Sequence, residues 1–347
     1  MKLYILYGSV STEHAVSVRS AKHVQETLAD AYTVVPVYIT ESGHFVVRSE
    51  KDSIRENENL TYPGTIGESI ADFTSQVTED DVVFPVIHGT GGEDGTLQGL
   101  LEMLDVPYVG SNVLSSAASY SKAVTNDLFY ACGVPQSAYL HVKRADYDEA
   151  PEAWREEMKR LAPVVYVKPS AAGSSIGVSR VEDMTELEAA LELAFRYDDE
   201  VVVEEEVEGR ELQLSVWGDD EIHVSLPGEY ERTGFFDYNA KYKGVHLDPI
   251  VPAHLSDEGI EKIRMIAAQA YRALHLNGFA RVDIFATDDE EFFVNEVNSI
   301  PGMSGSSMTP KIWEPSAGVS FRDFLIGLIE LARTTHAKKK STQRHYE

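Results

Sequence analysis

The sequence has only one cysteine, Cys132, among its 347 residues. A single cysteine excludes an intramolecular disulfide, so we expect the protein to work in a reducing compartment, the cytoplasm. The sequence also lacks an apolar run approaching the ~18 residues that cross a bilayer. Its opening, "MKLYILYGSVSTEH", has neither the long apolar core nor the cleavage site of a signal peptide. We therefore expect neither a membrane-spanning nor a secreted protein.

Positive charge is scarce as well. The chain carries 57 acidic and 30 basic residues, which gives a formal net charge of −27. An acidic surface repels nucleic acids and anionic membranes, so we expect neither as a partner. A polyanionic ligand would need a local cluster of lysine, arginine or metal ions to overcome this field.

Two common phosphate-binding motifs are missing from the sequence. No G-x-x-x-x-G-K-[ST] occurs, and "GTGGEDG" fails the G-x-G-x-x-G pattern because Asp94 stands where the last glycine belongs. A dinucleotide-dependent oxidoreductase is therefore disfavoured, although the start of the chain has a suitable α/β pattern.

The first third of the chain alternates strand and helix patterns. The segments "LYILYG", "YTVVPVYIT" and "DDVVFPVIHG" predict strands, and 13–29 and 96–105 predict helices. This alternation is typical of a parallel α/β sheet, whose ligands gather at the carboxyl ends of the strands. Later patterns predict helices from about 115, two strands around a Ser/Gly loop at 162–181, a helix at 185–198, strands at 200–209 and 211–226, a loop at 228–248, a helix at 257–275, a hairpin at 279–299, a helix at 320–334 and a disordered basic tail.

The hairpin "FARVDIFATDDEEFFVNEVNS" carries acids and a cation among apolar residues. A turn at "TDDE" that pairs Ala286 with Glu291 places Arg281 opposite Glu296 and Asp283 opposite Val294. Because side chains alternate along strands, the four polar side chains of this hairpin share one face: Arg281, Asp283, Glu296 and Asn298. Three oxygen ligands suit Mg²⁺, because phosphate oxygens of a nucleotide can complete its octahedral coordination. A solvated face with cross-strand ion pairs is the alternative.

Three further segments end strands with polar residues. In "VYVKPSAAGSSIGVS", Lys168 precedes small residues whose backbone N–H groups can turn toward a phosphate, although a flexible turn is the alternative. In "VVVEEEVEGRELQLS", the strand edge suits an adenine and Glu211 a ribose, or the acids serve solubility. In "HGTGGEDGTLQGLLE", His88 ends a strand, and we expect Glu93 and Asp94 to cap the next helix.

Taken together, four segments resemble the D-alanine–D-alanine ligases of the ATP-grasp superfamily: "HGTGGEDGTLQGLLEMLDVPYVGS", "VKPSAAGSSIG", "FFDYNAKY" and "NEVNSIPGMSGSSMTPK". The resemblance covers nearly the whole chain in order. It implies an α/β and α+β fold of three domains, with nucleotide held between two antiparallel-sheet domains. The implied domains are an α/β substrate domain at 1–118 with a parallel sheet, a central lid at 119–205, and a catalytic domain at 206–347 with a mobile loop at 228–248 and a basic tail.

The resemblance also implies roles for individual residues. The ATP contacts are Lys122, Lys168, Ser174, Ser175, Glu204, the Val207 backbone, Glu211 and Lys241. The metal ligands are Asp283, Glu296 and Asn298, which normally hold two Mg²⁺ ions, with Mn²⁺ as an alternative. The substrate and catalytic residues are Glu13 for the first D-alanine's ammonium, Ser174 and Tyr242 as its hydrogen-bonded partners, His88 near that substrate, Lys241 in the mobile loop, Arg281 and the Gly302 N–H as the oxyanion site, and Ser307 for the second carboxylate.

The implied activity is ATP-dependent formation of D-alanyl-D-alanine through an acyl phosphate, for peptidoglycan synthesis, by a homodimer. D-Lactate or D-serine as second substrate is the alternative; Tyr242 favours D-alanine because phenylalanine there tends to admit D-lactate in the family. A non-catalytic ATP sensor is a different class, which would be expected to lack Arg281 or the acids. The sequence departs from the family pattern at four places: Ser9, the "YSK" before the helix at 122, Asn126 and Ala171-Ala172.

Overall fold

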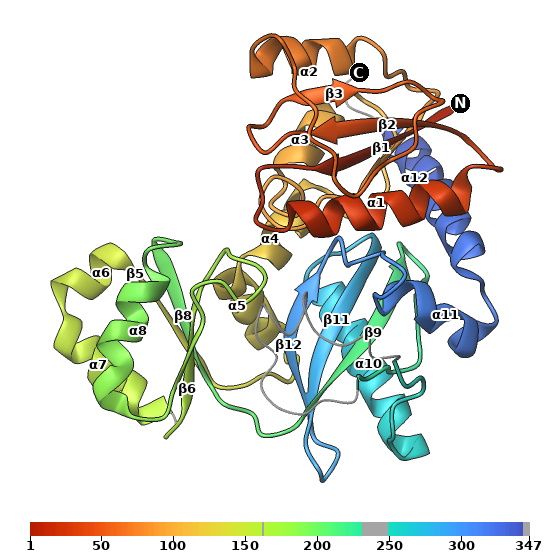
Figure 1. Ribbon diagram of the computed structural model, residues 1–347. Coiled ribbons are helices and arrows are strands. Elements are labelled where there is room, and N and C mark those ends of the chain that lie inside the picture. The colour runs from red at the N-terminus through yellow and green to blue at the C-terminus, as the bar shows by residue number, and fades with distance from the viewer. Residues whose placement is uncertain (162, 231–248, 343–347) are drawn as a thin grey trace.

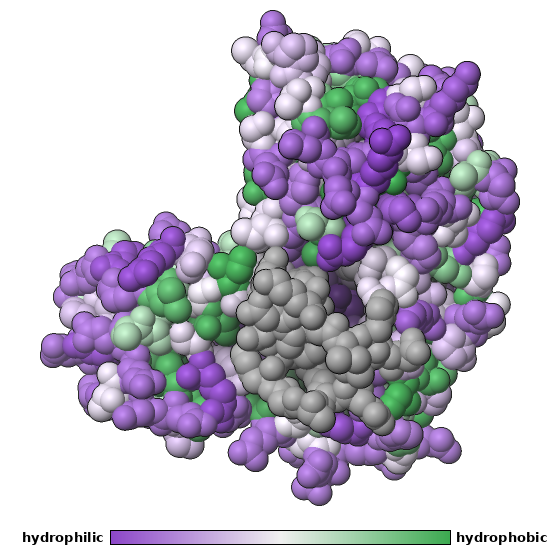
Figure 2. Space-filling model, in the orientation of Figure 1, coloured by the Kyte–Doolittle hydropathy of each residue, from purple (hydrophilic) through white to green (hydrophobic). Residues whose placement is uncertain are grey.

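The computed structural model describes residues 1–161, 163–230 and 249–342, which form three four-stranded sheets. Figure 1 shows the N-terminal sheet above and the other two sheets side by side beneath it. Hydrophilic residues cover most of the coloured surface seen in Figure 2. No helix within the described ranges is long and apolar enough to cross a membrane.

The N-terminal sheet has the order β3-β2-β1-β4. Strands β2 (Thr33–Ile39) and β4 (Val82–Pro85) flank β1 (Lys2–Gly8), and both run parallel to it. Their apolar residues are buried, as expected for a parallel sheet covered on both faces. A short edge strand, β3 (Phe45–Val47), runs antiparallel to β2 and was absent from the sequence prediction. The helices here are α1 (His14–Leu28), α2 (Ile66–Thr74) and α3 (Thr96–Met103).

The second sheet is antiparallel, in the order β5-β8-β6-β7. Its strands are β5 (Tyr139–Lys143), β6 (Val165–Pro169), β7 (Ser179–Val181) and β8 (Glu200–Glu205). Valines at alternate positions of β6 and β8 pack against the covering helices, which leaves the opposite face of the sheet for polar side chains. These helices are α6 (Arg144–Glu149), α7 (Pro151–Leu161) and α8 (Leu187–Ala194), the last preceded by a 3₁₀ turn at Met184–Glu186.

The third sheet is also antiparallel, in the order β10-β9-β11-β12. Its strands are β9 (Arg210–Gly218), β10 (Ile222–Val224), β11 (Gly278–Ala286) and β12 (Phe292–Asn298). Helix α10 (Asp257–Ala273) packs its apolar side against one face of this sheet. Helices α4 (Val113–Tyr120) and α5 (Lys122–Cys132) connect the N-terminal sheet to the second sheet.

The last two helices, α11 (Thr309–Ala317) and α12 (Phe321–Lys340), return to the N-terminal sheet. Phe324, Leu328 and Ile329 of α12 share one buried core with Leu3 and Phe84. The start and the end of the chain therefore complete the same hydrophobic core (Figure 1).

The prediction of a disordered tail over 336–347 is wrong for residues 336–340, which the structure describes as helix. Helix α12 continues to Lys340. Lys338 Nζ lies 2.6 Å from Asp220, Lys340 Nζ lies 2.5 Å from Glu79, and Lys339 pairs with Glu102. Cations are favoured at the end of a helix, and the acidic surface supplies their partners. Composition alone does not show that the lysines at the end of this helix meet acidic partners.

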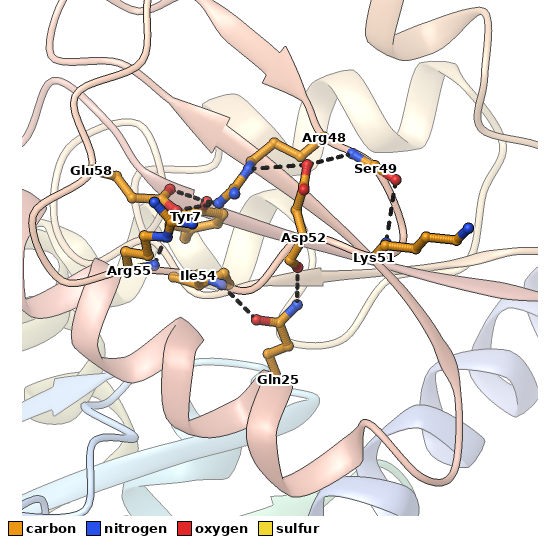
Figure 3. A network of polar contacts seen from close by, with 9 residues as sticks. All are labelled: Tyr7, Gln25, Arg48, Ser49, Lys51, Asp52, Ile54, Arg55 and Glu58. Carbon is orange, nitrogen blue, oxygen red and sulfur yellow. Dashed lines mark hydrogen bonds and ion pairs between the residues drawn. The ribbon is translucent and has the colours of Figure 1, made fainter.

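A long segment without regular structure, 48–65, is fastened to the N-terminal sheet by a polar network (Figure 3). The Tyr7 hydroxyl donates to Glu58, and Arg48 Nη1 bonds both Glu58 and, at 3.2 Å, the Tyr7 oxygen. Gln25 of α1 donates to the Asp52 carbonyl at 2.8 Å. Burial, with the Glu58 hydrogen bond, raises the pKa of Tyr7 well above its usual value, so this hydroxyl stays a donor.

Candidate active site

The β11–β12 hairpin brings its four polar side chains together, as the sequence predicted. Arg281 lies opposite Asn298, and Asp283 lies opposite Glu296. The Arg281 guanidinium donates two hydrogen bonds to the Asp283 carboxylate, from Nε to Oδ1 and from Nη2 to Oδ2, both at 2.7 Å. Asn298 Nδ2 lies 3.4 Å from an oxygen of Asp283 and 3.4 Å from an oxygen of Glu296. Three acids or amides and one cation therefore form a single cluster.

The predicted strand register is wrong. Ala286 pairs with Phe292 rather than Glu291, because residues 287–291 form the turn, in which Glu290 has a left-handed φ of 56°. A bulge beside Asp283 then shifts the register again and leaves Asn295 as an extra residue. Turn length and bulges depend on local backbone conformation, which alternation alone does not reveal.

The bulge has a consequence for the site. Asn295 Oδ1 lies 3.4 Å from Lys168 Nζ, and its Nδ2 donates to Glu211 at 3.3 Å. Sequence reasoning missed Asn295, although its place between Val294 and Glu296 in a strand of buried residues was a signal. Lys168 belongs to β6, so this contact joins the second and third sheets.

The acids outnumber the cation in the hairpin cluster. Burial raises the pKa of the Asp283 carboxyl, and Arg281 opposes this shift while Glu211 and Glu296 add to it. Burial also disfavours the charged form of Arg281, but the neighbouring carboxylates outweigh it and raise the pKa of that guanidinium. The excess of carboxylates makes this face attractive to a further cation.

The donor set fits Mg²⁺. Asp283 and Glu296 supply hard carboxylate oxygens, and a half-turn of the Asn298 amide supplies a third oxygen between them. Within the described ranges no group of three His, Cys, Asp or Glu side chains is arranged to hold a metal. Mg²⁺ takes few protein ligands and fills its shell with phosphate oxygens and water.

A second polar cluster lies on the facing sheet. Lys168 Nζ lies 2.5 Å from Glu204 Oε2, and Asn126 Nδ2 of α5 donates to Glu204 Oε1 at 3.0 Å. Burial alone would lower the pKa of Lys168, but Glu204, Glu296 and Glu211 raise it, so the ammonium stays charged. Val207 and Glu211 follow Glu204 at the crossing from β8 to β9.

The Ser/Gly loop after β6 is held in a strained shape. Ser174 and Ser175 both have left-handed φ angles, 54° and 59°, which non-glycine residues seldom adopt outside constrained sites. Lys122 Nζ donates to the Ala172 carbonyl at 2.7 Å, and the Ala171 N–H donates to Asp198 at 2.5 Å. The loop that contains Ser174 therefore lies against Lys122, the first residue of α5.

Glu13 lies where three segments meet. It follows β1, at the start of α1. A Cβ added to Gly89 would lie 2.9 Å from Glu13 Oε2, and one added to Gly173 would lie 2.8 Å from the same oxygen. Only glycine allows the backbone to approach the carboxylate this closely. Tyr242, predicted as a partner of Glu13, and Lys241, predicted in the same loop, lie outside the described residues.

Glu93 does not cap α3, so that prediction is wrong; Asp94 does accept from the Thr96 N–H at 2.9 Å. The Glu93 side chain turns inward and is only 8% exposed. Burial, with the nearby Glu13 carboxylate, raises the pKa of Glu93 to about 8. Burial also lowers the pKa of His88, which therefore stays neutral.

Gly302 and Ser307 lie together after β12. A Cβ added to Gly302 would lie 2.8 Å from Ser307 Oγ. The Ser307 hydroxyl also lies 2.9 Å from that of Ser304. Glycine at 302 therefore keeps open the space next to the serine that the sequence predicts for a carboxylate.

A parallel-sheet domain joined to two antiparallel sheets, which face each other with a lysine, acids and a Ser/Gly loop between them, is an ATP-grasp architecture. Two family models match the chain: "D-ala D-ala ligase N-terminus" over residues 2–111 and "D-ala D-ala ligase C-terminus" over residues 128–330. The chain belongs to the D-alanine–D-alanine ligase family.

Individual relatives match over nearly their full length. A D-alanine–D-alanine ligase of Halothermothrix orenii is 41% identical, over 96% of this chain and 98% of its own. One of Bacillus velezensis is 39% identical, over 96% and 98%. Among solved structures, the D-alanine–D-alanine ligase of Coxiella burnetii has a TM-score of 0.79 at 32% identity, covering 98% of this chain and 97% of its own. The VanG D-Ala:D-Ser ligase of Enterococcus faecalis has a TM-score of 0.78 at 34% identity, covering 95% and 99%.

Proposed function

We propose that this chain joins two molecules of D-alanine into D-alanyl-D-alanine, at the expense of ATP, for peptidoglycan synthesis. The observation that carries the proposal is the pairing of two clusters on facing sheets: the Arg281–Asp283 cluster of β11 and β12, and Lys168 of β6. Full-length relatives that carry this activity in their names support it.

We assign the ATP site to the space between the second and third sheets. Lys122, Lys168, Ser174 and Ser175 would neutralise and bond the phosphates, because lysines and backbone N–H groups complement their charge. Glu204 and the Val207 backbone would meet the adenine, and Glu211 the ribose. Asp283, Glu296 and Asn298 would hold Mg²⁺, which when bound supplies charge neutralisation at the transferring phosphoryl group.

In the first step, a carboxylate oxygen of the first D-alanine forms a bond to the γ-phosphorus. The bond from that phosphorus to the bridging oxygen breaks, and ADP leaves. Glu13 would orient this substrate through its ammonium group, and the glycines at 89 and 173 let the backbone approach that carboxylate closely. Lys241 and Tyr242, which the resemblance also assigns to this site, lie outside the described residues.

In the second step, the amine of the second D-alanine attacks the acyl carbon. Arg281 and the Gly302 N–H would stabilise the tetrahedral oxyanion, and Ser307 would hold the second carboxylate. Phosphate leaves with the original carboxylate oxygen and with the proton that the attacking amine gives up. Side-chain bulk at 302 would displace Ser307, as the 2.8 Å approach of a Cβ to its Oγ indicates.

We further propose that the protein works as a homodimer in the cytoplasm, where ATP is supplied, and that its domains divide near residues 118 and 205. D-Serine as second substrate is the competing possibility, because the VanG relative is a D-Ala:D-Ser ligase.

The test is ADP release by the purified protein with ATP and Mg²⁺, with products separated by mass. We expect turnover with D-alanine, none with L-alanine, and the dipeptide as main product when D-serine or D-lactate competes. A product that joins D-alanine to D-serine or D-lactate as the main species would show that D-alanine is not the preferred second substrate. ATP binding without turnover would support the non-catalytic sensor.

A further inference from the structure

The turn that carries Gly302, residues 300–303, is held from outside by the N-terminal sheet domain. On its first side, the Ile300 N–H donates to Glu93 Oε1 at 2.8 Å. The Ile300 carbonyl accepts from His88 Nδ1 at 2.7 Å. The other oxygen of Glu93 accepts from the Gly89 N–H at 2.8 Å. One residue of the turn is therefore bonded through both of its backbone polar groups.

The second side of the turn is held in the same way, by helix α1. The Met303 N–H donates to Ser20 Oγ at 3.1 Å, and the Met303 carbonyl accepts from His23 Nδ1 at 2.8 Å. Ser20 Oγ also lies 3.1 Å from His88 Nε2. The supports on the two sides of Gly302 are thereby linked to each other.

The hydrogen-bond directions agree with one protonation state. The carbonyl of Ile300 only accepts, so His88 Nδ1 carries the proton and the neutral ring accepts at Nε2. Ser20 then donates to that nitrogen and keeps its oxygen free to accept from Met303. The lowered pKa of His88 keeps the ring in this neutral form.

The supporting side chains are buried, so a backbone group that loses one of them cannot form a hydrogen bond to water instead. Ser20, His88 and Glu93 are 0%, 4% and 8% exposed. A buried backbone N–H that loses its acceptor costs ~1–3 kcal/mol, and the turn would shift to avoid that cost. Both ring nitrogens of His88 are bonded to protein atoms, so its place near the first substrate is explained by support of this turn.

We propose that Ser20, His88 and Glu93 are positioning residues that hold the Gly302 N–H in place for the oxyanion of the second step. The proposal rests on the proposed function, because it concerns the same site. It means that a domain assigned to the first substrate also controls the coupling of the acyl phosphate to the second.

Glu93→Gln is the sharpest variant. Both oxygens of a carboxyl group accept hydrogen bonds in either protonation state, whereas the amide nitrogen of glutamine accepts none. Either the Ile300 or the Gly89 N–H then loses its partner. We expect dipeptide formation to fall about tenfold or more, as the loss of ~1–3 kcal/mol implies. ADP released per dipeptide should rise above one, while the KM for ATP stays unchanged.

Asp81→Asn is the matched control. Asp81 is also buried, and its oxygens accept from the Lys2 N–H at 2.7 Å and the Thr78 N–H at 3.2 Å. It precedes β4, at the end of the sheet opposite to His88. We expect this variant to lose stability but to keep the wild-type ratio of ADP to dipeptide.

A second readout does not depend on activity. Hydrogen exchange followed by mass spectrometry should show faster exchange in peptides spanning 300–303 for Glu93→Gln, and for Ser20→Ala, but not for Asp81→Asn. Unchanged exchange and an unchanged ratio in Glu93→Gln would overturn the proposal. Wild-type protein without any turnover would instead remove the proposed function, and the exchange result would still decide whether these residues hold the turn.

Discussion

Arg281 and Asp283 form a two-bond ion pair across one face of β11, with both N–O distances at 2.7 Å. The pair joins the predicted oxyanion site to the predicted metal site, because one partner belongs to each. A planar guanidinium bonded to a carboxylate in this fork geometry is fixed in orientation. The position of the charge that meets the oxyanion therefore depends on a residue that also meets the metal.

The first prediction concerns this fork. Arg281→Lys keeps the charge but loses the two-bond geometry, and we expect kcat for dipeptide formation to fall by about a hundredfold, the scale of losing an oxyanion donor. Steady-state kinetics on the purified variant measure this. Arg333→Lys, whose partner is Glu330 on an exposed side of α12, is the control and should change nothing. A loss within threefold would separate Arg281 from the oxyanion.

The second prediction concerns the metal. Glu296→Gln removes the charge of one proposed Mg²⁺ ligand with little change of shape, so we expect turnover to vanish while the melting curve stays close to that of the wild type. Activity is measured over a titration of Mg²⁺. Near wild-type turnover at saturating Mg²⁺ would take Glu296 out of the metal site.

The third prediction concerns Asn126, whose Nδ2 lies 3.0 Å from Glu204 Oε1. Asn126→Asp sets a second buried carboxylate against the first, and like charges at that distance repel. We expect a lower melting temperature and a KM for ATP raised about tenfold, with the KM for D-alanine unchanged. Asn126→Ala is the neutral comparison and should have the smaller effect. Equal effects of the two variants would rule out repulsion as the cause.

The fourth prediction is a pH dependence of stability. Folding raises the pKa of Glu93 from 4.5 to about 8, so between these values the folded chain binds a proton that the unfolded chain has lost. The contribution of Glu93 to the free energy of unfolding therefore falls as pH rises from about 4.5 to 8 and is level beyond. Urea unfolding at several pH values measures it. Glu93→Gln should lack this downward contribution; parallel curves for the two proteins would contradict the shift.

The fifth prediction concerns the second substrate and Tyr242, which lies outside the described residues. In the family, phenylalanine at this place tends to admit D-lactate. We expect Tyr242→Phe to raise the share of ester product when D-alanine and D-lactate compete, as measured by mass spectrometry of the products. An unchanged ratio of ester to dipeptide would show that Tyr242 does not select the second substrate.

Much of the fold was accessible from the sequence because periodicity reports burial. The apolar runs of β1, β2 and β4 predicted a parallel sheet, and the alternation in the hairpin placed Arg281 and Asn298 on one face. These predictions depend only on which side chains are buried away from water.

The parts that failed depend on contacts between distant segments. The hairpin register was wrong because a bulge inserts Asn295. Glu93 was expected to cap the next helix, but its side chain accepts from the Ile300 N–H instead. That bond joins residues 207 positions apart, so no local pattern could predict it. Helix α12 continues past 334 to Lys340, where its lysines meet acids of distant segments, as Lys340 meets Glu79. Local patterns carry no information about such partners.

The central claim is that a carboxylate of D-alanine is phosphorylated before the peptide bond forms. D-Alanine labelled with ¹⁸O in both carboxylate oxygens tests it, with the inorganic phosphate from a complete reaction analysed by mass. We expect one ¹⁸O in each phosphate, because the oxygen that attacks the γ-phosphorus leaves with it. Phosphate without ¹⁸O, formed together with dipeptide, would contradict the acyl-phosphate mechanism.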